Sequence, residues 1–296
     1  MRTAAKTLVL MFAALTLSAQ GWVSQVVVFG DSLSDTGNFH AAAHPLPEDW
    51  PYIGTGASNG PLAVEKMAAI YGVPLVDFAF FGATTGVGNE FDLGTQTTPG
   101  QLNLPGVTTI YQGVRPGLEI DPQAVYVVWA GPNDLRTNGP LPQTVATAVT
   151  NLVVIVRDLE AAGAKHILVP GLPDLGLTPQ YAGTPESAAA TALSNGFNAL
   201  LMASLPKKAN YFDTAGWMRQ IFADPGAYGF TNVTEPCLGL SLCTTPATYF
   251  FWDTFHPTTA AHALMGELFA ECAQTRSGGH AALCRAGLGP EKGKKK

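Results

Sequence analysis

Apolar positions along the chain group into two alternating patterns. Short uninterrupted apolar runs, of which residues 26–29 are the first, stop abruptly at glycine or proline, and this is typical of buried parallel strands. Longer segments place apolar residues three and four positions apart, which is typical of helices with one buried face. The pattern predicts strands at residues 26–29, 75–78, 124–130, 166–170 and 210–212, and helices at residues 61–71, 145–161, 187–204 and 258–271.

Strands that alternate with helices predict βαβ units, in which a mostly parallel sheet carries helices on both faces. The expected architecture is therefore an α/β domain with three layers and a five-stranded sheet. Two segments rich in Gly, Thr and Pro, residues 84–123 and 224–248, interrupt the alternation. We interpret both as long surface loops of one domain, of the kind that often form lids or substrate walls.

The first 19 residues have the composition of a secretory signal peptide. Arg2 and Lys6 precede an apolar run over residues 7–17, and small residues follow it. The run is shorter than the roughly 20 residues that a membrane-spanning helix needs. We expect cleavage near residues 19–21 and a secreted or periplasmic protein, with an uncleaved N-terminal anchor as the alternative. The predicted organisation is a signal peptide at 1–19, one domain at 22–285 and a basic flexible tail at 286–296.

Composition and charge exclude some classes of protein. Hydrophobic residues make up 47% of the 296 positions and charged residues 13%, and the formal net charge is −6. The only cluster of lysines lies in the tail, so nucleic acid is not an expected partner, because phosphate binding needs clustered Lys and Arg. The 32 Gly and 22 Pro together stay below the share that marks low-complexity disorder. A folded domain is expected, and we expect a monomer.

The four cysteines indicate disulfides rather than a metal site. An even number in an exported chain is typical of two disulfides, and four cysteines allow three pairings. We favour the local pairing, Cys237–Cys243 and Cys272–Cys284. Their spacing lacks the tight pairs of a zinc site. His40 and His44 are spaced like two ligands on a helix, but no third ligand accompanies them. No metal and no cofactor are expected.

Glycine and polar residues lie in the segments that follow several of the predicted strands. In an open parallel sheet such residues meet at the carboxyl edge, where ligands bind. Ser32 follows the first strand, Gly82 the second and Asn133 the third, and Asp253 and His256 precede the last helix. Each of them alone has an ordinary structural interpretation, such as a helix cap or a turn. Together they fill every role of one chemistry.

That chemistry is acyl transfer. A serine hydroxyl becomes a nucleophile when histidine takes its proton and a carboxylate orients the histidine. Ser32, His256 and Asp253 fit these three roles. The oxyanion that forms needs fixed donors, for which the backbone N–H groups of Ser32 and Gly82 and the Asn133 amide are the candidates. Candidate substrate-contacting side chains are Phe81, Trp252 and Phe255, although core packing is the favoured interpretation of the aromatic run at 249–252.

The same segments resemble a known family. Residues 28–38, Val-Phe-Gly-Asp-Ser-Leu-Ser-Asp-Thr-Gly-Asn, are similar to the first sequence block of the GDSL lipases, also called SGNH hydrolases. Gly82, the run Gly131-Pro132-Asn133-Asp134 and the run Asp253-Thr254-Phe255-His256-Pro257 are similar to the second, third and fifth blocks. Phe81 departs from the pattern, because many members have a second glycine there. The resemblance implies a flavodoxin-like α/β/α fold and a single SGNH hydrolase domain.

The predicted function is a secreted serine esterase or lipase that hydrolyses carboxylic esters through an acyl-enzyme. Its expected partner is a small-molecule or lipid ester, and peripheral contact with lipid surfaces stays open. Phospholipid acyltransferase, lysophospholipase and choline-ester hydrolase are alternatives at the same site. A catalytically dead lipid- or glycan-binding protein is the remote alternative. The G-x-S-x-G elbow of ordinary α/β-hydrolases does not occur in the sequence.

Overall fold

A computed structural model describes residues 22–42, 51–52, 56–137, 142–239, 243–275 and 282–284 of the chain. The expected signal peptide, the tail at 286–296 and His44 lie outside the described residues. Within the described part, no helix has both the length and the apolar character needed to cross a membrane.

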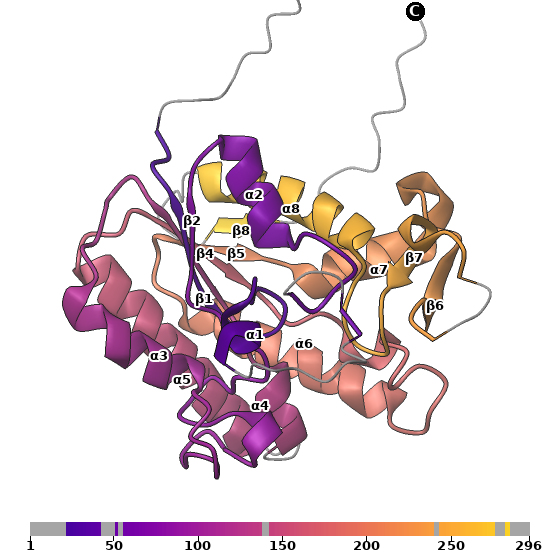
Figure 1. Cartoon of the computed structure of the whole chain (residues 1–296), viewed down its shortest axis with the longest axis horizontal. Helices are drawn as coiled ribbons and strands as arrows, with labels where there is room; N and C mark the ends of the chain where they lie inside the picture. The colour runs from indigo at the N-terminus through magenta and orange to yellow at the C-terminus, as the bar shows by residue number, and fades with distance from the viewer. Residues whose placement is uncertain are drawn as a thin grey trace, which may run out of the picture.

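The core of the fold is a parallel sheet in the order β2-β1-β3-β4-β5-β8 (Figure 1). The predicted five-stranded parallel sheet is confirmed, and β8 extends it by a short edge strand that the sequence pattern did not reveal. Every residue of β1 and β3 is buried, because helices cover both faces of the sheet. The strands are β1 (Val26–Gly30), β2 (Leu75–Asp77), β3 (Val125–Trp129), β4 (His166–Pro170), β5 (Ala209–Phe212) and β8 (Ala282–Cys284).

Alternate residues of the central strands point into two separate cores. Val27 and Phe29 of β1 pack against α3 (Val107–Val114), α5 (Pro142–Ala161) and α6 (Ser187–Ser204). Val26 and Val28 pack against α2 (Ala63–Tyr71), α7 (Thr214–Ala223) and α8 (Thr259–Gln274) on the opposite face. Figure 1 shows these two helical layers above and below the sheet. The three-layer arrangement follows from the two-residue period of the strands.

Shorter elements fill the connections. They are α1 (Asn38–Ala42), α4 (Pro132–Thr137), the 3₁₀ helices η1 (Glu90–Asp92), η2 (Arg115–Gly117), η3 (Leu175–Leu177), η4 (Pro225–Tyr228) and η5 (Pro246–Thr248), and the paired strands β6 (Asn232–Pro236) and β7 (Tyr249–Phe251). The side chains of Phe250 and Phe251 are buried in the α2–α7–α8 core. Core packing, the favoured interpretation of this run, therefore holds for both phenylalanines.

The expectation that residues 84–123 form one long surface loop is wrong over α3. Val107 and Tyr111 of this helix are buried against the sheet. Its eight residues include a glycine and two threonines, so the surrounding Gly, Thr and Pro composition masked the helical spacing. The preceding segment folds around Asp92, whose carboxylate accepts hydrogen bonds from the backbone N–H groups of Leu102 and Leu104.

Two disulfides join residues that are close in sequence. Cys237 is bonded to Cys243, and Cys272 is bonded to Cys284, as the favoured pairing expects. The second bond links the C-terminal part of α8 to the edge strand β8. Because β8 has only three residues, this bond supplements a small number of strand contacts at that edge of the sheet.

Candidate active site

Ser32 lies in a tight turn at the carboxyl end of β1. The Asp31 carbonyl accepts hydrogen bonds from the N–H groups of Ser34 and Asp35, and the Asp31 carboxylate accepts one from Leu33. Gly30 is required where the turn begins, because a Cβ there would lie 2.6 Å from a backbone oxygen of β3. The turn places Ser32 at the carboxyl end of the sheet, where the residue is 5% exposed.

Asp253 and His256 lie in a short loop between β7 and α8. The N–H of Trp252 donates to the carbonyl of His256 over 2.8 Å and closes the loop. Asp253 Oδ1 accepts the N–H groups of Phe255 and His256, at 2.7 and 2.6 Å. These contacts turn the two side chains toward each other. The hydroxyl of Thr258 then caps α8, which begins at the next residue.

The three side chains form one continuous line of hydrogen bonds. Ser32 Oγ lies 2.9 Å from His256 Nε2, and His256 Nδ1 lies 2.7 Å from Asp253 Oδ2. Burial alone would raise the pKa of Asp253, but the charge of His256 and hydrogen bonds from His256 and Phe255 outweigh it and lower this pKa to about 2. Asp253 is therefore an anion at neutral pH and faces the ring nitrogen opposite Ser32.

Gly82 and Asn133 lie on the segments that follow β2 and β3. Gly82 has a φ of 75°, and a Cβ at this position would lie 2.3 Å from the Phe91 ring, so only glycine fits. Within the described residues, the N–H groups of Ser32 and Gly82 donate no hydrogen bond. Asn133 Nδ2 donates to the Ala83 carbonyl over 3.0 Å, which joins the two segments. Among the residues that the structure describes, the second amide hydrogen of Asn133 has no acceptor.

A buried carboxylate that the sequence pattern did not reveal, Asp134, ties these segments together. Asp134 accepts hydrogen bonds from the N–H and the hydroxyl of Thr85 and from Gln96, all between 2.7 and 2.8 Å. Burial raises the pKa of Asp134 to about 6, although these hydrogen bonds oppose the rise. The network fastens the segment after Gly82 to the start of α4. Its position directly after Asn133 in the sequence was the available signal.

Aromatic rings surround the histidine. The rings of Phe81 and Phe255 each lie 5.5 Å from the imidazole of His256, measured between centroids. Phe91, which is 53% exposed, packs against Phe81 at 5.0 Å. Trp252 directly precedes Asp253 in the sequence. Its indole N–H donates a hydrogen bond to the Pro51 carbonyl over 3.0 Å. Of the three predicted aromatic residues, two therefore contact the histidine ring and one does not.

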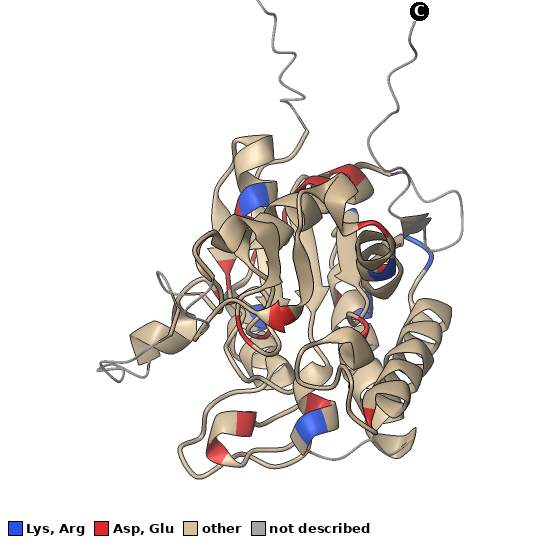
Figure 2. Cartoon of the chain, turned by 90° about the vertical axis from the view of Figure 1, so that its right-hand side faces the viewer, with Lys and Arg blue, Asp and Glu red and all other residues tan. Residues whose placement is uncertain are grey.

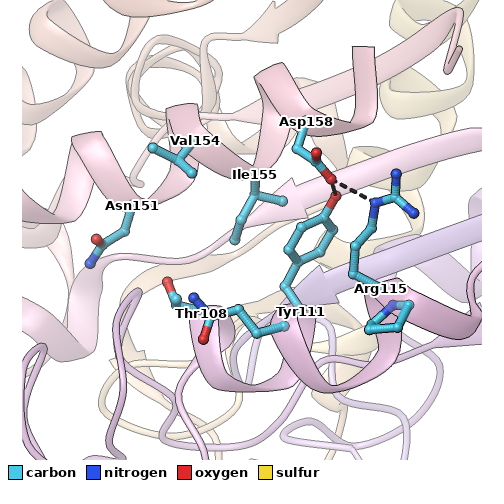
Figure 3. Close-up of a pocket in the computed structure, with 9 residues that line it drawn as sticks. Thr108, Tyr111, Arg115, Asn151, Val154, Ile155 and Asp158 are labelled. Carbon is cyan, nitrogen blue, oxygen red and sulfur yellow. Dashed lines mark hydrogen bonds and ion pairs between the residues drawn. The ribbon is translucent and has the colours of Figure 1, made fainter. Parts of the chain in front are cut away.

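A separate hollow of about 590 Å³ lies between α3 and α5 (Figure 3). It contains none of the predicted site residues. At one end Asp158 accepts hydrogen bonds from Tyr111 and Arg115, at 2.5 and 2.6 Å. Figure 2 shows acidic and basic residues distributed in small groups along the ribbon of the chain. Among the described residues no group of three or more His, Cys, Asp or Glu side chains could hold a metal ion.

A parallel three-layer domain with this polar cluster at the carboxyl end of its sheet has the architecture of the SGNH hydrolases. A model of the GDSL-like lipase/acylhydrolase family matches residues 26–269, so the chain belongs to that family. The chain is similar to esterase EstA of Pseudomonas aeruginosa, with 30% identity over 82% of this chain and 46% of the esterase. It is also similar to the phosphatidylcholine-sterol acyltransferase of Aeromonas hydrophila, with 24% identity over 82% of this chain and 88% of that protein.

The chain spans between about half and just under two thirds of the length of several curated relatives that it matches. Among solved structures, it resembles a variant of an acetyl-xylooligosaccharide esterase from Geobacillus, with a TM-score of 0.51 and 13% identity. That match covers 86% of this chain and 97% of the other. At this level of identity the likeness shows the fold alone.

Proposed function

We propose that this chain is a secreted or periplasmic serine esterase that hydrolyses carboxylic esters through a covalent acyl-enzyme. The observation that carries the proposal is the line of hydrogen bonds from Ser32 through His256 to Asp253. Family membership supports the reaction class. The two disulfides support export, because such bonds persist in oxidising compartments. The signal peptide expected at residues 1–19 would direct that export.

The first half of the reaction forms the acyl-enzyme. Ser32 Oγ attacks the ester carbonyl carbon while His256 Nε2 takes the hydroxyl proton, and the Asp253 carboxylate stabilises the resulting imidazolium. Collapse of the tetrahedral intermediate breaks the bond to the alcohol, which leaves with the proton from His256. In the second half, water attacks the acyl group in the same way, releases the carboxylic acid and restores Ser32.

The negative oxygen of the tetrahedral intermediate needs donors that are fixed before the reaction. In our proposal the backbone N–H groups of Ser32 and Gly82 and the side-chain amide of Asn133 supply them. Both N–H groups are unused within the described residues, which supports this role. The glycine-only geometry at residue 82 and the contact of Asn133 with Ala83 support a rigid arrangement.

The rings beside His256 support an ester with an apolar acyl or aryl part. Phe81 and Phe255 contact the imidazole, and Phe91 extends this aromatic surface outward to solvent. We propose that these three side chains contact the apolar part of the substrate. Burial of such a group contributes about 25 cal/mol per Å² of apolar surface, so a longer chain along these rings would bind more tightly.

Acyl transfer to an alcohol other than water is the second candidate function. Ser32 and His256 are only 5% and 6% exposed, so the acyl-enzyme would be partly protected from bulk water. The similarity to a phosphatidylcholine-sterol acyltransferase over 88% of its length favours the same alternative. Supplying a long-chain alcohol during turnover separates the two functions, because a transferase forms a new ester and a hydrolase releases free acid.

The decisive test of the proposed function is Ser32→Ala, assayed with nitrophenyl esters from acetyl to palmitoyl. We expect turnover to fall at least about a thousandfold. A fluorophosphonate should label the unmodified protein at Ser32 and leave the variant unlabelled. Ser34→Ala is the matched control, since Ser34 lies in the same turn, is fully buried and has no hydrogen-bond partner for its hydroxyl within the described residues. Near-normal activity of Ser32→Ala would refute the assignment.

A further inference from the structure

One contact of the Asp253 carboxylate comes from a distant part of the chain. The hydroxyl of Tyr52 donates a hydrogen bond to Asp253 Oδ2 over 2.9 Å, across 201 residues of sequence. The Tyr52 ring lies edge-on to the His256 imidazole at 5.9 Å and tilted to the Phe81 ring at 5.7 Å. Tyr52 therefore lies beside the candidate triad and bonds its acid directly.

This hydrogen bond completes the coordination of the carboxylate. An ionised carboxylate offers about four lone-pair sites on its two oxygens. Two backbone N–H groups occupy Oδ1, and His256 Nδ1 occupies one site on Oδ2. Tyr52 supplies the fourth donor. Burial and the negative charge of Asp253 raise the pKa of Tyr52 far above the neutral range, so the phenol keeps its proton and remains a donor.

A second contact fixes Tyr52 in this position. The indole N–H of Trp252 donates to the carbonyl of Pro51 over 3.0 Å, so residues 51–52 are joined to residues 252–253 at two adjacent points. A single hydrogen bond would hold the phenol only loosely. Two of them define both where the backbone lies and where the hydroxyl points. This also gives Trp252 a structural role that the predicted substrate contact did not include.

We infer that Tyr52 is a positioning residue, whose hydroxyl fixes the Asp253 carboxylate in the orientation that holds His256 toward Ser32. The inference rests on the proposed function. The phenol adds a fourth hydrogen bond that rotation of the carboxylate would have to break, so Nδ1 keeps its partner and Nε2 stays 2.9 Å from Ser32 Oγ. Small displacements of catalytic groups lower the rate of the chemical step more than they weaken substrate binding.

The test is Tyr52→Phe, which keeps the ring and removes the hydroxyl. We expect kcat for a nitrophenyl ester to fall about tenfold while KM changes less than about twofold, because the lost contact orients a catalytic group and touches no substrate. Thermal unfolding should shift little. The matched control is Tyr111→Phe, which removes a similar bond to Asp158 on the far helical layer (Figure 3). It should leave both constants unchanged.

A second variant, Trp252→Phe, removes the indole N–H that binds the Pro51 carbonyl, and so weakens the contact that holds Tyr52 in place. It should lower kcat less than Tyr52→Phe does, and the double variant should resemble Tyr52→Phe alone, because both changes act through one interaction. Unchanged kcat in Tyr52→Phe, or a rise in KM at constant kcat, would overturn the inference. So would losses that simply multiply in the double variant. Loss of activity in Ser32→Ala together with full activity in Tyr52→Phe would refute the positioning role of Tyr52 and leave the esterase proposal intact.

Discussion

Two carboxylates in this molecule have almost the same partners. Asp253 accepts hydrogen bonds from Tyr52 and His256, at 2.9 and 2.7 Å. Asp158 accepts them from Tyr111 and Arg115, at 2.5 and 2.6 Å. Each set consists of a phenol, a carboxylate and a nitrogen group that can be positive. The short list of partners therefore cannot explain why only one set lies in the candidate active site.

The difference lies in the surroundings. The side chain of Asp253 is 15% exposed and that of Asp158 is 46% exposed. Two backbone N–H groups also bind the first carboxylate and, with Tyr52, restrict its rotation. The pKa of Asp158 is lowered chiefly by the Tyr111 hydrogen bond, whereas at Asp253 a larger cost of burial is overcome by His256. Burial and the backbone hydrogen bonds therefore hold the Asp253 carboxylate in a more defined orientation than the exposed Asp158 carboxylate.

Neutralising each acid in turn tests the difference between the two carboxylates most directly. Asp253→Asn should lower kcat by about three to four orders of magnitude, because the amide favours the wrong tautomer of His256. Asp158→Asn, its matched control, should keep kcat within about twofold, because exposed charge clusters contribute little. Nitrophenyl ester kinetics on both purified variants measure the effect. Equal losses in the two variants would show that the two acids do not differ in function.

Most of the fold could be predicted from local sequence pattern. The helix predicted at residues 187–204 has these same bounds in α6, and the strand at residues 166–170 has those of β4. Helix α7 was missed although Asp213 caps it and Trp217 and Ile221 form its buried face at helical spacing. It follows β5 after a single residue and begins Thr-Ala-Gly, so strand and helix patterns merge there.

The loss of folding stability in acid provides a second test of the difference between the two carboxylates, and its expected effect is smaller. Asp253 has its pKa lowered from 3.8 to about 2 by folding, so in acid the unfolded chain takes up its proton first. Its contribution to the free energy of unfolding, about 2 kcal/mol, is therefore present above pH 4 and lost as the pH falls toward 2. Asp158 also has a lowered pKa, but its exposure makes the corresponding loss smaller.

Urea unfolding at pH 5 and at pH 2 measures this contribution. The unmodified protein should lose about 2 kcal/mol more over this interval than Asp253→Asn does, because the amide does not titrate. The same comparison with Asp158→Asn should give a smaller difference of the same sign. A larger difference for Asp158→Asn than for Asp253→Asn would contradict the prediction, because it would mean that folding stabilises the ionised form of the exposed acid more than that of the buried one.

The candidate site could be predicted where its residues follow predicted strands or, for Asp253 and His256, precede the last helix. Ser32, Gly82 and Asn133 lie in the segments that follow β1, β2 and β3, which parallel topology brings together at the carboxyl end of the sheet. Tyr52 belongs to a stretch with no periodic pattern and reaches Asp253 across 201 residues. Such a contact depends on how two irregular segments pass each other, and no local spacing encodes that.

The smallest expected effect concerns the exposed cluster itself. Arg115→Gln removes the charged partner of Asp158, and we expect the free energy of unfolding to fall by less than about 1 kcal/mol, with unchanged ester kinetics. Raising the salt concentration should erase part of even this difference, because ions screen exposed pairs. Parallel urea titrations of both proteins at low and high salt provide the measurement. A loss of several kcal/mol, insensitive to salt, would place Arg115 and Asp158 among the structurally essential pairs and remove the contrast with Asp253.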